Sequence, residues 1–271
     1  MIAIVTDSSV GYSTAEIADR GIVSVVPLNY NVGGKNFEEK ASDKNGNFMP
    51  LIRGVPCKTA QPALNSFIQT FSSLVAKGCD IICIVLSSSL SGTYSSAKFA
   101  AGQVGGNIRV IDSRTIGAGM HLLVDEAVNL VKAGVAFDRA VEMLEALKSK
   151  IGVVFSVETL ENLIAGGRLN TAKAKTTLNN RPVFELKAKI LFKCNVRGAR
   201  ERLEEMIACI PENTRRIIVC RCGDGTDVSA LTELLKARHP NVYIHQRVLG
   251  PVLSIHVGDG AFGVAYVTKN Q

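Results

Sequence analysis

The chain has 271 residues, of which 46% are hydrophobic and 20% charged, and its formal net charge is +7. This balance excludes a disordered chain, and the longest uninterrupted apolar run, residues 81–86, is too short to span a bilayer. The first residues show neither a basic start nor a small-residue cleavage site, so we expect a cytoplasmic protein.

The basic residues are dispersed along the chain. Arg215 and Arg216 are adjacent, but no run of five or more basic residues occurs, and aromatic residues do not alternate with basic ones. The positive charge suits acidic partners in general. We therefore expect no nucleic-acid binding and leave open a transient contact with an anionic membrane surface.

The first half of the chain alternates strand-like and helix-like segments, which predicts a mainly parallel sheet flanked by helices. Residues 31–57, rich in Gly, Asn, Lys and Pro, predict a long irregular excursion. Polar turns follow three predicted strands and should meet at the ligand crevice of such a sheet. The predicted strands cover residues 2–6, 22–28, 81–86 and 108–111, and the helices cover residues 15–20, 62–77, 116–133 and 138–150, with another opening at residues 91–93.

The second half predicts a further α/β unit, which divides the chain into domains of residues 1–150 and 151–271. A short helix-like stretch is expected after Arg168. The predicted strands cover residues 151–155, a pair near 182–192, then 217–221, 242–246 and 262–267, and the helices cover residues 158–165, 197–209 and 226–237.

We expect no metal and no cofactor. The seven cysteines are scattered, as is typical of reduced thiols, and no histidine lies at metal-ligand spacing from Cys220 and Cys222. Residues 258–263 match GxGxxG, but a dinucleotide site needs a helix after this motif, and here a strand-like segment follows. Because a phosphate-binding GxxxxGK[ST] loop is also missing from the sequence, we do not expect the chain itself to bind ATP.

Ser91 has three interpretations. It can be the N-cap of the helix that follows, a hydroxyl that binds a ligand, or a nucleophile activated by His256 in a serine hydrolase. Its flanking residues, Leu90 and Gly92, do not form a GxSxG nucleophile elbow. The first two roles are compatible, because a helix start offers free N–H groups to an anion.

Three more polar residues lie at predicted turns. Thr59 precedes a helix start and is either a plain turn residue or a second hydroxyl directed at the same anion. His256 precedes a glycine-rich turn and is a structural or a functional histidine. Arg168 follows two glycines and is either a cation at a helix C-terminus or an exposed functional group.

Several segments, in order over nearly the whole chain, resemble the DegV family. The most specific are Leu90-Ser91-Gly92-Thr93-Tyr94 and Gly166-Gly167-Arg168, which lie far apart in the sequence. The others are Val5-Thr6-Asp7-Ser8-Ser9, Thr59-Ala60-Gln61-Pro62, Asp112-Ser113, Glu158-Thr159-Leu160, Arg181-Pro182, Val196-Arg197 and His256-Val257-Gly258-Asp259-Gly260-Ala261.

The resemblance implies a two-domain α/β protein that buries a long-chain fatty acid between its domains. It also implies a non-catalytic role, in which the chain presents the carboxylate to a separate ATP-dependent fatty-acid kinase subunit that supplies phospholipid synthesis. By motif, Thr59 and Ser91 correspond to the hydroxyls that bind the carboxylate. Arg168 and His256 correspond to polar residues near the headgroup, and Arg197 to a residue that docks the kinase subunit.

The sequence departs from the family pattern at several positions. Ala60 and Ala63 replace two serines, Asp259 replaces a proline beside the headgroup motif, and residues 188–189 replace an Asp-Gly pair. The negative charge of Asp259 could repel a phosphate or neutralise Arg168 or His256. The alternatives are a lipid carrier without a kinase partner and the serine hydrolase that uses Ser91 and His256.

Overall fold

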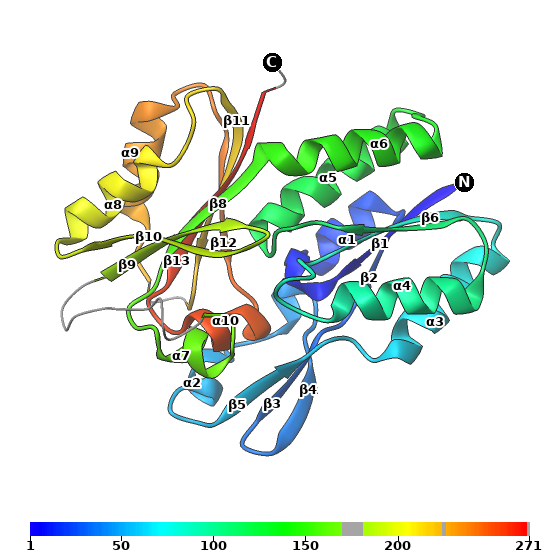
Figure 1. The fold of residues 1–271 in the computed structure, drawn as a ribbon, viewed down its shortest axis with the longest axis horizontal. Coiled ribbons are helices and arrows are strands. Elements are labelled where there is room, and N and C mark those ends of the chain that lie inside the picture. Colours follow the sequence, from blue (N-terminus) through cyan, green and yellow to red (C-terminus); the bar gives the residue numbers. More distant parts are fainter. Residues whose placement is uncertain (170–180, 224–225, 270–271) are drawn as a thin grey trace.

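The computed structural model describes residues 1–169, 181–223 and 226–269. Its strands form a four-stranded sheet, a six-stranded sheet and a three-stranded sheet, with helices packed against the two larger sheets (Figure 1). The α/β class expected from the sequence is confirmed. The predicted helix-like stretch after Arg168 falls in residues 170–180, outside the described residues.

The four-stranded sheet is parallel, with the order β2-β1-β6-β7. Alternate residues of β1 and β6 point to opposite faces, so Ile4 and Ile82 join one core while Val5 and Ile81 join another. Its strands are β1 (Ile2–Asp7), β2 (Val23–Val26), β6 (Asp80–Val85) and β7 (Ile108–Asp112).

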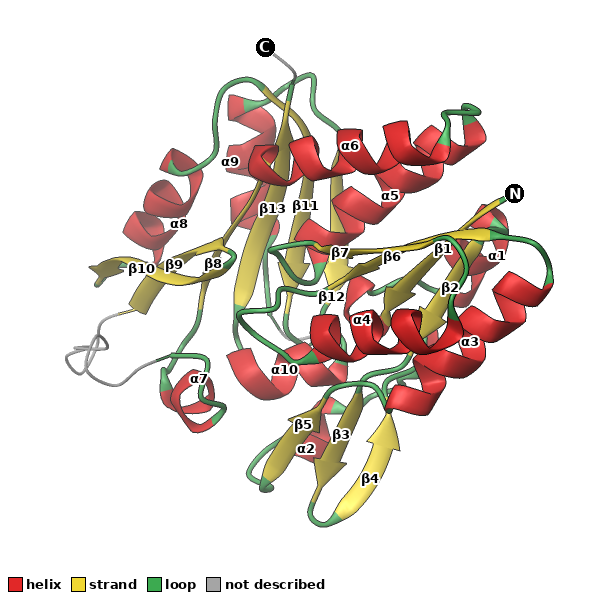
Figure 2. Cartoon of the chain, turned by 45° about the vertical axis from the view of Figure 1, so that its right-hand side comes forward, coloured by secondary structure: helices red, strands yellow, loops and turns green. Residues whose placement is uncertain are grey.

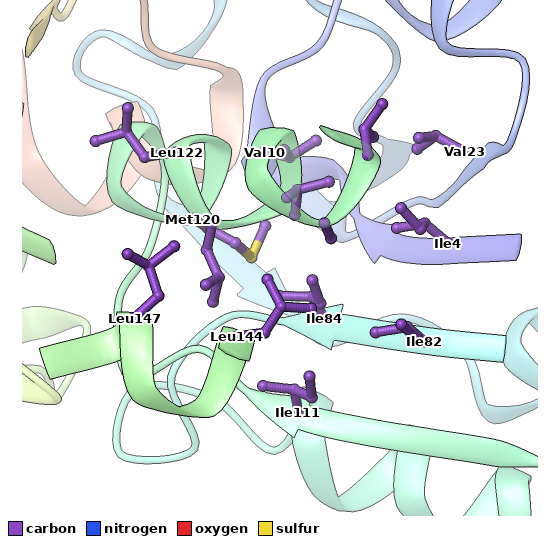
Figure 3. Close-up of a cluster of buried hydrophobic side chains, with 14 of the residues drawn as sticks. Ile4, Val10, Val23, Ile82, Ile84, Ile111, Met120, Leu122, Leu144 and Leu147 are labelled. Atoms are coloured by element: carbon purple, nitrogen blue, oxygen red, sulfur yellow. The ribbon is translucent and has the colours of Figure 1, made fainter. Parts of the chain in front are cut away.

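Helices cover both faces of this sheet, as predicted. The core of Ile4, Ile82 and Ile84 packs against the helical residues Met120 and Leu144 (Figure 3). The helices on this side are α5 (Ala118–Lys132) and α6 (Phe137–Leu147), those on the other side are α3 (Leu64–Ala76) and α4 (Thr93–Val104), and α1 (Thr14–Arg20) follows β1.

The six-stranded sheet is mixed, with the order β10-β9-β8-β13-β11-β12, and begins directly after a 3-10 turn at Lys148–Lys150. The domain boundary at residue 150 stays a prediction. The strands are β8 (Ile151–Ser156), β9 (Arg181–Lys187), β10 (Lys189–Val196), β11 (Thr214–Arg221), β12 (Ile244–Val248) and β13 (Phe262–Thr268), and the helices of this part are α7 (Glu161–Ala165), α8 (Ala199–Ala208), α9 (Ser229–Arg238) and α10 (Pro251–Val257).

The expected irregular excursion over residues 31–57 is wrong, because this segment contributes to an antiparallel sheet. Gly33 and Gly34 both have positive φ and close a two-residue hairpin in which Tyr30 stacks on Phe37. This sheet has the order β4-β3-β5 and lies at the end of the molecule where α2, α7 and α10 gather (Figures 1 and 2). Its strands are β3 (Asn29–Val32), β4 (Lys35–Glu38) and β5 (Cys57–Ala60), and α2 spans Met49–Ile52.

The polar turns after β1, β6 and β7 lie together as expected, but their residues 7–9, 87–89 and 112–113 are not among the described residues that line the cavity next to this edge. Asp7 accepts hydrogen bonds from the N–H groups of Ser9 (3.0 Å) and Leu86 (2.7 Å), and Asp112 accepts one from the hydroxyl of Ser88. These bonds fix the carboxyl end of the parallel sheet.

Among the helices of the described residues, none combines the length and the apolar character that a membrane-spanning helix needs.

Two carboxyl groups are buried near this edge. Burial raises the pKa of Asp7 to about 6 and that of Glu39 to about 7. The folded chain thus binds a proton at both groups more tightly than the unfolded chain does. The stability that they contribute is present below their unfolded-state pKa values and is lost as the pH rises through 6–7.

This gives a prediction on stability. Between pH 5 and pH 8, the wild type should lose about 2 kcal/mol more unfolding free energy than a Glu39→Gln variant, which cannot ionise there. Urea unfolding of both proteins at the two pH values measures this difference. Equal losses in the two proteins would show that Glu39 does not titrate in this range.

Helix α3 begins without a side-chain cap. Ala63 occupies its N-cap position with extended backbone angles and forms no capping bond. An Ala63→Ser substitution should therefore raise the unfolding free energy by about 1 kcal/mol, because the hydroxyl can accept an N–H bond of the first turn. Thermal unfolding checks this, with Ala60→Ser in neighbouring β5 as a control that gains no cap, and an unchanged midpoint for Ala63→Ser would contradict it.

Candidate ligand-binding site

A cavity lies between the six-stranded sheet and the turns at the carboxyl end of the four-stranded sheet. It holds about 1040 Å³ of empty space, part of it open to solvent, and its wall is mainly aliphatic. Four of the five candidate site residues, namely Thr59, Ser91, Arg168 and His256, lie in this wall. We call these four residues the polar cluster.

One side of the apolar wall is made by a face of the six-stranded sheet. Val153 and Phe155 of β8 are paired with Ala265 and Gly263 of β13 on this face. The intervening Val154 points to the opposite face, into the core beneath α8 and α9. Gly263 has no side chain and Ala265 only a methyl group, so neither residue extends far from the sheet into the cavity that they line.

The first pair of the polar cluster is Thr59 and His256. Thr59 lies on β5 and His256 in the last turn of α10, and the Thr59 hydroxyl is 2.7 Å from His256 Nε2. The other ring nitrogen, Nδ1, is buried without a partner among the described residues. Since an unpaired buried donor is costly, the bond favours the tautomer with the proton on Nε2, which leaves the Thr59 proton free to point into the cavity.

His256 is neutral at physiological pH. Burial is the main cause, and the nearby Arg168 guanidinium adds to it, so that the pKa of His256 falls to about 4. The imidazole thus orients Thr59 but brings no positive charge. An electrostatic role for a protonated His256 would require a pH well below neutrality.

The permanent charge of the cluster belongs to Arg168. Its Nε donates to the carbonyl of Leu90 at 3.1 Å, and its side chain also bonds the carbonyl of Gly166. Among the described residues no carboxylate forms an ion pair with it, and residues 170–180 contain no Asp or Glu. A half-buried cation held by carbonyls beside a cavity can receive an anionic group.

One interpretation of Ser91, that it is the N-cap of the following helix α4, is wrong. The N-cap position belongs to Gly92, and the Ser91 hydroxyl lies 2.8 Å from the hydroxyl of Thr93. Because the described partner of His256 Nε2 is Thr59, the structure shows no hydrogen bond between Ser91 and a histidine base. Ser91 remains a hydroxyl at the cavity wall, next to the carbonyl that binds Arg168.

Two further residues from the sequence lie apart from the cluster. Arg197 is exposed between β10 and α8 and does not line the cavity. Asp259 is exposed and pairs with Arg53 rather than with Arg168 or His256. Of the two alternatives for Asp259, neutralisation of Arg168 or His256 is therefore wrong, and repulsion of a phosphate stays a prediction.

Sequence reasoning missed the importance of Gly166 itself. A Cβ at this position would lie 2.5 Å from His256 Nδ1, so the missing side chain allows the imidazole to pack against the turn after α7. The backbone of Gly166 is in the ordinary right-handed region, so conformation does not require glycine there. The Gly-Gly-Arg motif was the only signal, and it pointed to Arg168.

The chain is similar to known proteins over its whole length. A family model described as "Uncharacterised protein, DegV family" matches residues 1–269. A DegV domain-containing protein of Streptococcus pyogenes serotype M6 is 31% identical, with 97% of each chain covered.

Two solved structures share the fold. A Thermus thermophilus DegV-family protein, reported for its fatty acid binding, is 28% identical with a TM-score of 0.88 and 99% of each chain covered. The Streptococcus pneumoniae Fatty Acid Kinase B3 protein, loaded with linoleic acid, is 22% identical with a TM-score of 0.85, and the match covers 99% of this chain and all of that one. On the family model and the close curated relative, this chain belongs to the DegV family.

Proposed function

We propose that this protein binds a long-chain fatty acid, with the acyl chain in the cavity and the carboxylate at the polar cluster. The observation that carries the proposal is an aliphatic cavity whose wall contains two hydroxyls and the Arg168 guanidinium, which forms no ion pair with any described residue. The fatty acid binding reported for the Thermus thermophilus relative supports it.

The energetics agree with this division of roles. Each buried methylene contributes about 0.8 kcal/mol, so the acyl chain supplies the affinity. A carboxylate leaves water only where charge-assisted hydrogen bonds replace its hydration. Arg168, Thr59 and Ser91 can donate such bonds, and they fix which end of the ligand meets the cluster.

The proposal is tested by comparing palmitic acid with its methyl ester. Both have the same acyl chain, but the ester lacks the charge that Arg168 would receive. The acid should bind about tenfold more tightly or better, measured by calorimetry on delipidated protein. Equal affinities would show that the cluster does not receive a carboxylate.

The finer part of the proposal is that the bound carboxylate is presented to a separate ATP-dependent kinase subunit. With His256 neutral, Arg168 is the residue of the polar cluster that would supply positive charge near a transferred phosphate. Arg197, exposed and outside the cavity, is the proposed docking residue.

This part has its own test. With a fatty-acid kinase subunit and ATP, Arg197→Ala should slow acyl phosphate formation while palmitate affinity stays unchanged. Unchanged phosphorylation would remove Arg197 from the interface, and no acyl phosphate with the wild type would leave a lipid carrier without this partner.

A further inference from the structure

Glu39 is a buried carboxyl group that no described cation neutralises. It follows β4, is only 3% exposed, and forms no ion pair with any described residue. The preceding residue, Glu38, is exposed. Burying a carboxyl group away from a counter-ion costs free energy, so its position calls for specific hydrogen bonds.

These bonds connect Glu39 to the start of α10. One carboxyl oxygen accepts from the hydroxyl of Ser8 at 2.7 Å, and the other accepts from the N–H of Val252 at 3.0 Å. The helix begins at Pro251, which has no N–H, and its N-cap Gly250 supplies no side-chain bond. Glu39 therefore supplies from another segment the acceptor that a local N-cap would normally provide.

Gly250 makes this contact possible. A Cβ at position 250 would lie 2.4 Å from the Glu39 oxygen that binds Val252. The backbone of Gly250 is extended, with φ −72° and ψ 170°, which any residue can adopt. The glycine thus serves the close approach of the carboxyl group.

The same three-stranded sheet also contacts the other end of α10. Glu39 follows β4 and holds Val252, while Thr59 of β5 holds His256, four residues and about one helical turn further on. Two hydrogen bonds, one from the residue directly after β4 and one from β5, thus hold the start of the helix and the imidazole at its end.

We propose that Glu39 is the positioning residue of the polar cluster: through the N-terminus of α10 it sets the distance between His256 and Thr59. The proposal rests on the proposed function for its effect on fatty acid affinity. Its structural part concerns which nitrogen of the His256 ring carries the proton, and this does not depend on any ligand.

The experiment compares Glu39→Leu with the isosteric Glu39→Gln and with Glu38→Leu, the same change at the exposed neighbour. Nitrogen NMR of His256 in delipidated protein reports which ring nitrogen carries the proton, and calorimetry reports palmitate affinity. Glu39→Leu should give the mixed tautomers of an unrestrained imidazole and bind palmitate about tenfold more weakly. Glu39→Gln, which can still accept from Val252, should keep the Nε2-protonated ring, and Glu38→Leu should match the wild type in both measurements.

A wild-type ring signal and affinity in Glu39→Leu would overturn the proposal. If Glu39→Leu does not fold, Gly250→Ala takes its place, since the added methyl displaces the carboxyl oxygen from Val252 while the carboxyl group stays. If the wild type binds no palmitate, the proposed function fails, and the ring signal alone then decides the role of Glu39.

Discussion

Replacing Val153 with phenylalanine should weaken palmitate binding by about 100-fold. Val153 lies on the cavity face of β8 and is partly accessible from the cavity, so a ring at this position grows into the space for the acyl chain. A ring that displaces about four methylenes removes about 3 kcal/mol of burial. Calorimetry with delipidated protein measures the change.

The matched control is Val248→Phe, the same substitution at an exposed position of the edge strand β12. It should bind palmitate as the wild type does. Circular dichroism shows whether both variants fold, and a short-chain acid should lose less affinity to Val153→Phe than palmitate does. Full palmitate affinity in a folded Val153→Phe protein would place the acyl chain elsewhere.

Replacing Arg168 with methionine should also cost about 100-fold in palmitate affinity. Methionine keeps much of the stem that lines the cavity but removes the charge, so the carboxylate would enter a site of neutral donors. The methyl ester of palmitic acid, which has no charge to lose, should bind both proteins alike.

Arg200→Met provides the control for this variant, because Arg200 lies on the surface of α8 and pairs with Glu204. It should leave both affinities unchanged. If the ratio of the affinities for the acid and the ester were the same in Arg168→Met as in the wild type, another group would have to receive the carboxylate.

The sequence predicted the alternating strands and helices of the first half because their apolar patterns are long and regular. It failed for residues 31–57, where Asn31 and Asn36, together with Asn29 just before this range, make strands β3 and β4 look polar. The Gly33-Gly34 pair was an available hairpin signal. Likewise Pro251, directly after Gly250, was an available signal for a helix start, but helix α10 was not predicted.

The site was predictable as a set of residues but not as a geometry. Thr59 and His256 are 197 positions apart, and their contact depends on how α10 packs against β5. Local spacing does not encode this packing. The contact of Glu39 with Val252 was missed for the same reason. A glutamate in a polar segment is expected at the surface, and the sequence alone does not show that it is buried.

The measurement that tests the central claim most directly is mass spectrometry of the small molecules released from the gently purified protein. The account predicts long-chain fatty acid in near-stoichiometric amount, replaced by added palmitate on exchange. No bound lipid, together with no uptake of added palmitate by the folded protein, would contradict it.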